Sequence, residues 1–381
     1  MDPVQRKKLF SGAKRIVLKV GSGVLTRRSG LNLNLIDDLA ADICQLRRRG
    51  IEVILVSSGA IAAGMRKIGL ARRPAGVSAM QALAAMGQSR LMTAYEEAFA
   101  RYGEKVAQVL LTRDDLTHRR RYLNARNTLF TLLSWKVTPV INENDTVVAD
   151  EIKFGDNDAL SAMVVSLIGA DLLVNLTNID GLYDRDPRVH PEARRIALVE
   201  RVDRRIQQYA STIPGALGTG GMASKIAAAR KAALGGVPTV IANGTAPGVI
   251  RDIFAGKPVG TLFLPESTAL SRKKQWIAFT KATKGTLVVD AGAEKALVQN
   301  HKSLLPSGIR EVSGRFAVGN AVAVHGEDGR RIGIGLVNYS AEQLTRIAGA
   351  KSSQIETLLG FRHDDEAIHR DNLVLSEEID Q

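Results

Sequence analysis

Six short apolar runs, separated by segments with helical periodicity, constrain the fold of this 381-residue chain more than any other feature. Each run is rich in Val, Ile and Leu without alternation, which is typical of strands covered on both faces. Such runs alternating with helices predict an α/β fold in which helices sandwich a mostly parallel, open sheet. The runs are Ile16–Val20, Val53–Val56, Val106–Leu111, Val137–Ile141, Leu172–Leu176 and Thr239–Ala242.

The pattern changes near Gly285, where short strand-like pieces separated by glycines replace the βα units. This change predicts a second, small β-rich domain. A basic stretch without clear periodicity, SRKKQWIAFTKATK, lies between the two parts. We therefore expect a large domain at 1–270, a linker at 271–284, the β-rich domain at 285–370 and a tail at 371–381.

Lys and Arg outnumber Asp and Glu by 52 to 39, which gives a net charge of +13 and suggests nucleic acid as one class of partner. The excess does not lie in the C-terminal domain. From Lys284 to the end there are 11 basic and 14 acidic residues, a net charge of −3, so the rest carries +16. A basic N-terminal domain equally suits anionic small substrates such as nucleotides.

The N-terminus lacks the apolar run of about 7–15 residues that a secretory signal needs, and the most apolar stretch, 159–176, is interrupted by Gly169 and Asp171. We expect a cytoplasmic protein without a transmembrane helix. Cys44 is the sole cysteine, and the six His residues lack metal-binding spacing. No disulfide and no zinc site of the cysteine type is expected.

Ligands of open α/β sheets bind at the carboxyl ends of the strands, so the residues after the apolar runs form the candidate site. Lys19 needs an anionic partner if it is buried, and Gly21 and Ser22 after it suit a phosphate-binding loop. The alternative is a lysine that extends to solvent at the strand end. Ser58, in the loop after the second run, suits either a ligand at a helix N-terminus or a tight βα turn.

Acidic and amide side chains gather at 142–145 and again at 155–158, before an apolar helix. Asn157 and Asp158 suit a helix N-cap. So many acids and amides also suit the binding of a substrate ammonium group and the orientation of lysines, and we favour this second interpretation. A fourth loop, at 218–225, is rich in glycine and opens a helix that contains Lys225. Backbone N–H groups, a helix dipole and a lysine together indicate a phosphate site, in which Lys225 would complement Lys19.

Together these segments resemble the amino acid kinase family, and within it the branch that phosphorylates glutamate and carries a C-terminal PUA domain. The resemblance covers nearly the whole chain, and it implies the amino acid kinase fold followed by a small β pseudo-barrel. The motifs that carry it are KVGSGVLT, SSGAIAAG, GQSRL, LNARNT, PVINEND, EIKFGDND, GLYDRDPR, ALGTGGMASK, SLLPSGI and RIAGAKS.

The resemblance implies a kinase that uses ATP and Mg²⁺ to convert L-glutamate to L-glutamyl 5-phosphate, at the entry to proline biosynthesis. Lys19 and Lys225 would neutralise the phosphates, and Asp158 would orient both lysines. Ser58, Asp145 and Asn157 would hold glutamate. The nucleotide would be lined by Lys19, Gly21, Ser22, Thr177, Asn178, Thr219, Gly220, Gly221, Met222, Ala223, Ser224 and Lys225.

Two positions depart from the family pattern. Asn178 stands where relatives often have Asp, and Gly23 stands where Ser or Thr is common, so nucleotide contacts and one hydroxyl donor are affected. Family behaviour also implies homo-oligomers and inhibition by proline. Two alternatives stay open: a kinase of the same fold for acetylglutamate, aspartate or UMP, and RNA binding by the PUA-like domain, which its net charge of −3 disfavours.

Overall fold

The structure is a computed structural model that describes residues 1–27, 30–147, 157–211, 221–266, 271–280 and 283–380. The chain divides into two compact units, Met1–Ala269 and Leu270–Gln381. Of the residues expected at the site, Thr219 and Gly220 lie outside the described residues, as do Gly155 and Asp156 of the third loop.

An eight-stranded sheet forms the centre of the first unit, as the apolar runs predict. All six runs are strands, each longer than its expected range by one or two residues. Two short strands, β10 and β8, extend one edge and were not predicted. The strands in sheet order are β5 (Lys105–Leu111), β6 (Val137–Glu143), β4 (Glu52–Ser57), β1 (Arg15–Val20), β7 (Leu172–Thr177), β9 (Thr239–Asn243), β10 (Thr261–Phe263) and β8 (Leu198–Val199).

The order of the strands reverses next to β1, which is the structural reason for a site there. The strands from β5 to β9 are parallel, and only β10 and β8 run in the opposite direction. From β1 the chain continues to β4 on one side of it, whereas β7 pairs with its other side. A crevice at the carboxyl ends of the strands is expected at such a reversal.

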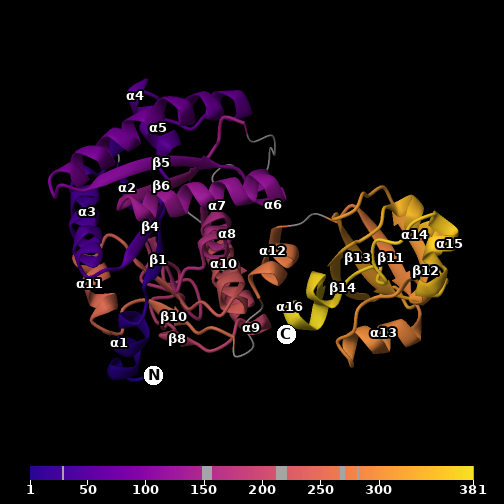
Figure 1. Cartoon of the computed structure of the whole chain (residues 1–381). Helices are drawn as coiled ribbons and strands as arrows, with labels where there is room; N and C mark the ends of the chain where they lie inside the picture. The colour runs from indigo at the N-terminus through magenta and orange to yellow at the C-terminus, as the bar shows by residue number, and fades with distance from the viewer. Residues whose placement is uncertain (28–29, 148–156, 212–220, 267–270, 281–282, 381) are drawn as a thin grey trace. The chain divides into compact units, whose positions relative to one another are not determined.

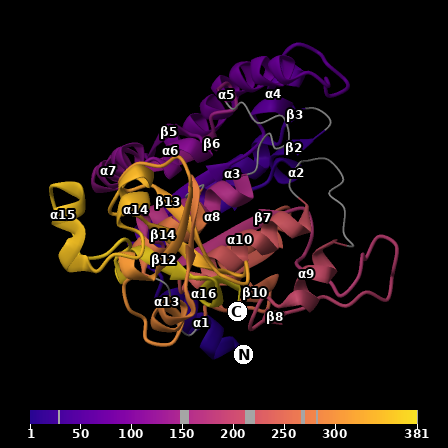
Figure 2. The ribbon, with the colours of Figure 1, turned by 90° about the vertical axis from the view of Figure 1, so that its right-hand side faces the viewer.

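Helices cover both faces of this sheet (Figure 1). Helices α3, α5 and α11 lie on one face, while α7, α8 and α10 lie on the other, where α8 and α10 pack side by side (Figure 2). Within the described residues, no helix has the length and apolar character needed to cross a bilayer. The helices of this unit are α1 (Pro3–Ser11), α2 (Ser22–Leu25), α3 (Leu33–Arg48), α4 (Ala60–Lys67), α5 (Val77–Ala100), α6 (Arg113–Thr117), α7 (Arg119–Ser134), α8 (Asn157–Ile168), α9 (Arg204–Ser211), α10 (Met222–Leu234) and α11 (Val249–Phe254), and a small ribbon of β2 (Thr26–Arg27) and β3 (Gly30–Leu31) completes it.

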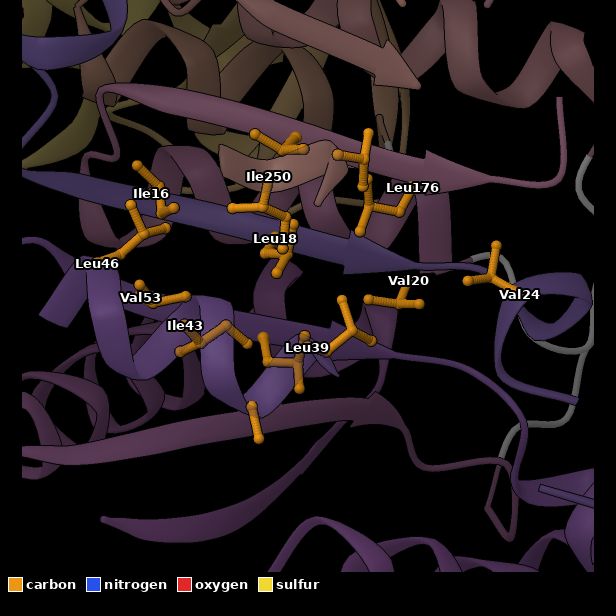
Figure 3. Packing of buried hydrophobic residues seen from close by; sticks show 14 of the residues in the cluster. Ile16, Leu18, Val20, Val24, Leu39, Ile43, Leu46, Val53, Leu176 and Ile250 are labelled. Carbon is orange, nitrogen blue, oxygen red and sulfur yellow. The ribbon is translucent and has the colours of Figure 1, made fainter. Parts of the chain in front are cut away.

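The alternation of side chains along β1 decides which residues enter the apolar core and which enter the site. Ile16, Leu18 and Val20 point into the core under α3, where they meet Leu39 and Ile43 (Figure 3). Successive side chains of a strand point to opposite faces. The lysine between Leu18 and Val20 therefore faces the other layer, where α8 packs against β1.

The second unit contains a five-stranded mixed sheet with its own apolar core. The stretch expected to be a linker, 271–284, contains helix α12, and the expected tail, 371–381, contains β15, an edge strand of this sheet. In sheet order the strands are β12 (Ile309–Gly314), β11 (Gly285–Val289), β13 (Ala321–Gly326), β14 (Arg331–Leu336) and β15 (Leu373–Leu375), and the helices are α12 (Arg272–Thr280), α13 (Ala291–Val298), α14 (Ala341–Ile347), α15 (Ile355–Leu359) and α16 (Ser376–Asp380).

Candidate active site

Two lysines and one aspartate meet beneath the carboxyl ends of β1 and β7. Lys19 comes from β1, Asp158 from the first turn of α8 and Lys225 from the first turn of α10. Lys19 Nζ lies 2.5 Å from Asp158 Oδ1, and Lys225 Nζ lies 3.0 Å from Asp158 Oδ2. All three side chains are buried, with exposed fractions of 5%, 1% and 7% for Lys19, Asp158 and Lys225. The expected grouping of these three residues is therefore present, and Lys19 is not a lysine that extends to solvent.

Two uncharged side chains complete the surroundings of the Asp158 carboxylate. Asn175 Nδ2 donates to Oδ1 at 2.8 Å, and Ser224 Oγ donates to Oδ2 at 2.7 Å. Burial raises the pKa of Asp158, but the charges of Lys19 and Lys225 and the hydrogen bonds from Lys19 and Ser224 outweigh burial and hold that pKa well below its ordinary value. Asp158 is therefore a permanent carboxylate, and the cluster carries one excess positive charge.

The loop after β1 leaves the Lys19 ammonium uncrowded. Gly21 N–H donates to Leu176 O at 3.0 Å, so this N–H is already engaged within the protein. A Cβ at Gly21 would lie 3.4 Å from Leu176 O and 3.7 Å from Lys19 Nζ. Ser22, the next expected residue, opens the short helix α2 and accepts a hydrogen bond from Thr26 Oγ1 at its carbonyl oxygen.

The two departures from the family pattern are neighbours in space. A Cβ at Gly23 would lie 3.3 Å from Asn178 Nδ2, so the Asn178 amide occupies the space beside this glycine. Thr177 ends β7, and its Oγ1 donates to Asn178 Oδ1 at 3.4 Å. The two expected nucleotide residues after β7 thus lie next to the loop that follows β1.

The described residues of the glycine-rich loop differ in what their side chains contact. Gly221 is the N-cap of α10, and its carbonyl oxygen lies 2.8 Å from Ser224 Oγ, which shares its single proton between this oxygen and Asp158 Oδ2. Met222 is buried in a small apolar cluster with Ile226, so any contact from it to a nucleotide involves its backbone. Ala223 is exposed. Ser224 donates to Asp158, which places this residue in the lysine–aspartate cluster.

Ser58 and Asn157, two of the three residues expected to hold glutamate, are in direct contact. Asn157 Nδ2 donates to Ser58 Oγ at 2.9 Å and to Asn142 Oδ1 at 2.9 Å, and Asn142 Nδ2 donates to Gln88 Oε1 at 2.8 Å. Because Asn157 precedes Asp158 in α8, this amide network adjoins the lysine–aspartate cluster. Asp145, the third expected residue, is buried two residues beyond the end of β6.

Three buried polar atoms have no hydrogen-bond partner among the described residues: Asn157 Oδ1 and Gln88 Nε2 within this network, and Asp145 Oδ1, three residues after Asn142 in the chain. Two of them are acceptors and one is a donor. Burial, partly offset by Arg73, raises the pKa of Asp145 from 3.8 to about 6. Unpaired buried groups of this kind cost about 1–3 kcal/mol each, so they suit a ligand with both an ammonium and a carboxylate group.

A close helix crossing holds Gln88 near the Ser58 loop. Helices α4 and α5 meet at two glycines, where a Cβ at Gly64 would lie 1.9 Å from Leu83 O and a Cβ at Gly87 would lie 1.7 Å from Ala60 O. Only glycine permits such an approach of two helix backbones. Gln88, which follows one of these glycines, is thereby held beside the start of α4.

The sequence reasoning assigned no role to Gln88, Asn142 or Asn175 individually. A signal for Asn175 was present, because it is the one amide within the buried run LLVNLT and lies beside Lys19 in the strand register. Gln88 and Asn142 lie within the quoted motifs GQSRL and PVINEND. Nothing in their spacing shows that they meet, since 54 residues separate them.

Comparison with known proteins is consistent with this geometry. The model of the amino acid kinase family matches residues 14–243, and that of the PUA domain matches 285–359. The chain belongs to the amino acid kinase family. Its similarity to a PUA domain lies in the second unit, which has its own sheet and core.

Three curated relatives are similar over nearly the whole chain, and each bears the name Glutamate 5-kinase. The protein from Geobacter sulfurreducens is 54% identical over 97% of this chain and all of that protein. The protein from Geobacter metallireducens is 55% identical with the same coverage, and that from Meiothermus ruber is 53% identical over 96% of this chain and 97% of its own length. A solved carbamate kinase from Giardia lamblia is 13% identical, with a TM-score of 0.48, over 67% of this chain and all of its own.

Proposed function

We propose that this chain transfers the γ-phosphoryl group of ATP to the γ-carboxylate of L-glutamate, forming L-glutamyl 5-phosphate for proline biosynthesis. One observation carries the proposal. The consecutive residues Asn157 and Asp158 join a network with unpaired polar atoms, which suits an amino acid, to a pair of lysines, which suits phosphates. The name shared by relatives with more than 50% identity supports glutamate as that amino acid.

At the amino acid end of the site, Asp145 and Asn157 each offer their Oδ1 atom as an acceptor for the substrate ammonium group. Gln88 Nε2 and the Ser58 hydroxyl are donors for the α-carboxylate. An ammonium group next to Asp145 would offset the cost of burying that carboxylate. This arrangement directs the side-chain carboxylate of glutamate toward Lys19 and Lys225.

At the phosphate end, the reaction needs little acid or base assistance, because a carboxyl group with a pKa near ~4.3 is already an anionic nucleophile at neutral pH. The difficulty is to bring a carboxylate against a polyphosphate. Lys19 and Lys225 would offset this repulsion and stabilise charge on the transferring group. Asp158 keeps both ammonium groups in position, so catalysis rests on alignment and electrostatics.

Mg²⁺ is the metal that such a reaction uses, and we propose that it enters with ATP, held by phosphate oxygens and water. Asp158 does not fit as a metal ligand, because four donors already occupy its two oxygens. The ion supplies further neutralisation of phosphate charge. We propose that the ATP is lined by Lys19 and the other residues expected to bind the nucleotide, Thr219 and Gly220 among them.

The test is ATP-dependent formation of γ-glutamyl hydroxamate from L-glutamate and hydroxylamine in the presence of Mg²⁺, with ADP measured in parallel. Aspartate, acetylglutamate and UMP serve as competing acceptors. We expect hydroxamate with glutamate only, and loss of it in the Lys225→Ala variant. ADP release with one of the other acceptors, and none with glutamate, would assign the chain to a different kinase of the same fold.

We also propose that proline inhibits this reaction at or near the glutamate site, since its ammonium and carboxylate groups match those of glutamate. Inhibition that glutamate does not relieve would place proline elsewhere. We further propose that the protein is cytoplasmic and forms homo-oligomers. Light scattering of the purified chain measures the oligomeric state.

A further inference from the structure

Asn175 is the one amide in the buried strand β7, and its position is energetically unfavourable in itself. The side chain is fully buried, and its Oδ1 has no hydrogen-bond partner among the described residues. A buried amide group that lacks a partner destabilises the folded state. The single hydrogen bond that the structure gives this side chain runs from Nδ2 to Asp158 Oδ1.

The four donors around Asp158 form two matched pairs. Each carboxylate oxygen accepts from one lysine and from one neutral group: Oδ1 from Lys19 and Asn175, and Oδ2 from Lys225 and Ser224. A carboxylate has about four acceptor positions, so this one is saturated. Asn175 lies opposite Lys19 in the register between β7 and β1, which aims both side chains at the same oxygen.

The lysines alone could not both hold Asp158 and follow the moving charge. As negative charge develops on the transferring phosphoryl group, each ammonium gains by moving toward it. If the lysines were the only donors, this movement would leave a buried carboxylate without hydrogen bonds, which is strongly unfavourable. A neutral donor on each oxygen avoids this, because without a net charge it is attracted to the phosphoryl group much less than an ammonium is.

We propose that Asn175 and Ser224 are positioning residues that keep Asp158 hydrogen-bonded and in place while Lys19 and Lys225 shift toward the transferring phosphoryl group. This inference rests on the proposed function, since it assumes phosphoryl transfer at the two lysines. Asn175 has no expected contact with a substrate, and the Ser224 side chain is engaged with Asp158, so any contact of Ser224 with the nucleotide comes from its backbone, which Ser224→Ala keeps. Their effect therefore falls on turnover and leaves substrate binding unchanged.

The decisive variant is Asn175→Leu, which has a similar size and removes the donor from an otherwise apolar strand. We expect it to fold, with kcat about 10- to 100-fold lower and with KM for ATP and glutamate within about twofold of the wild type. Asn175→Ala gives a second measurement with the same missing donor. Ser224→Ala should lower kcat in the same way, and the double variant should lose more than the product of the two single losses, because no neutral donor then remains.

The matched control is Thr138→Val. Thr138 is a buried residue of β6, and the change removes its partly buried hydrogen bond from Arg47 Nη1. Its kcat should stay at the wild-type level. A normal kcat in folded Asn175→Leu would overturn the proposal, and so would a raised KM for ATP with kcat unchanged, or an equal loss of kcat in Thr138→Val. The wild type, assayed with glutamate, tests the proposed function separately. If the wild type uses another acceptor, kcat and KM of the variants relative to the wild type, measured with that acceptor, test the inference.

Discussion

Asp145 allows a quantitative test of the amino acid end of the site. Its carboxylate is buried, and Oδ1 has no hydrogen-bond partner within the part of the chain that the structure describes. Burial, partly offset by Arg73, raises the pKa from 3.8 to about 6. Between these two values the folded protein binds a proton that the unfolded chain has already lost. Stability from this group is therefore fully present below about pH 4 and is lost as the pH rises through about 6.

The Asp145→Asn variant removes this titration with little change in shape. A difference of about two pKa units corresponds to about 3 kcal/mol. The free energy of unfolding of the variant minus that of the wild type should therefore rise by up to this amount from low to high pH. Roughly half of this gain should appear between pH 5 and pH 8. The variant should at the same time lose its affinity for glutamate, because the ammonium group has lost its counter-charge.

The assay is urea denaturation of both proteins at pH 5, 6, 7 and 8 without substrates, followed by glutamate titration at pH 8. Glu97→Gln, which changes an exposed carboxylate on α5, is the control, and its stability is measured relative to the wild type at the same four pH values. A constant difference in stability between Asp145→Asn and the wild type across this range would refute the argument that the folded protein holds this carboxylate unpaired. Unchanged KM for glutamate would move the substrate ammonium elsewhere.

Two other predictions concern the lysines and the helix crossing. Lys225→Ala should lower kcat by about 10²–10³-fold while the protein stays folded, whereas Lys257→Ala, which breaks a surface ion pair with Asp252, should keep full turnover in an ADP-release assay. Gly87→Ala should destabilise the fold by about 1–3 kcal/mol and raise KM for glutamate, because the added Cβ meets Ala60 O. The control is Gly76→Ala, whose added Cβ enters open space. Equal melting temperatures for the two variants would contradict this prediction.

The sheet could be predicted from the sequence because strands buried on both faces need unbroken apolar runs. The edge strands β8 and β10 escaped prediction, since two or three residues are too few to show a pattern. Helix α12 lies in 271–284, where the basic residues conceal any apolar periodicity. In each case the structure depends on contacts with residues far away in the chain, which local composition does not record.

The site was predictable where a residue was out of place in its local pattern. Lys19 within an apolar strand predicted an anionic partner, and Asp158 is that partner. Asn175 is equally out of place, but an amide gives no sign of its partner's charge, so its contact with Asp158 needed the structure. Gln88 lies in the long helix α5, whose sequence does not show which residue it meets, and the glycine crossing with α4 places it beside the amide network.

The residual charges of the two ends of the site bear on which acceptor the enzyme prefers. The cluster of Lys19, Asp158 and Lys225 has one positive charge in excess, whereas Asp145 supplies a buried carboxylate whose Oδ1 has no hydrogen-bond partner among the described residues. An amino acid with a free ammonium group at one end and a carboxylate at the other satisfies both. Acetylglutamate has no ammonium group, so binding it would leave the buried Asp145 carboxylate with only the partial compensation that Arg73 gives. A site with such an unpaired polar group rejects the acceptor that lacks its partner more strongly than a mere difference in size would allow. The same charges therefore favour glutamate over its acetylated form before any steric argument is made.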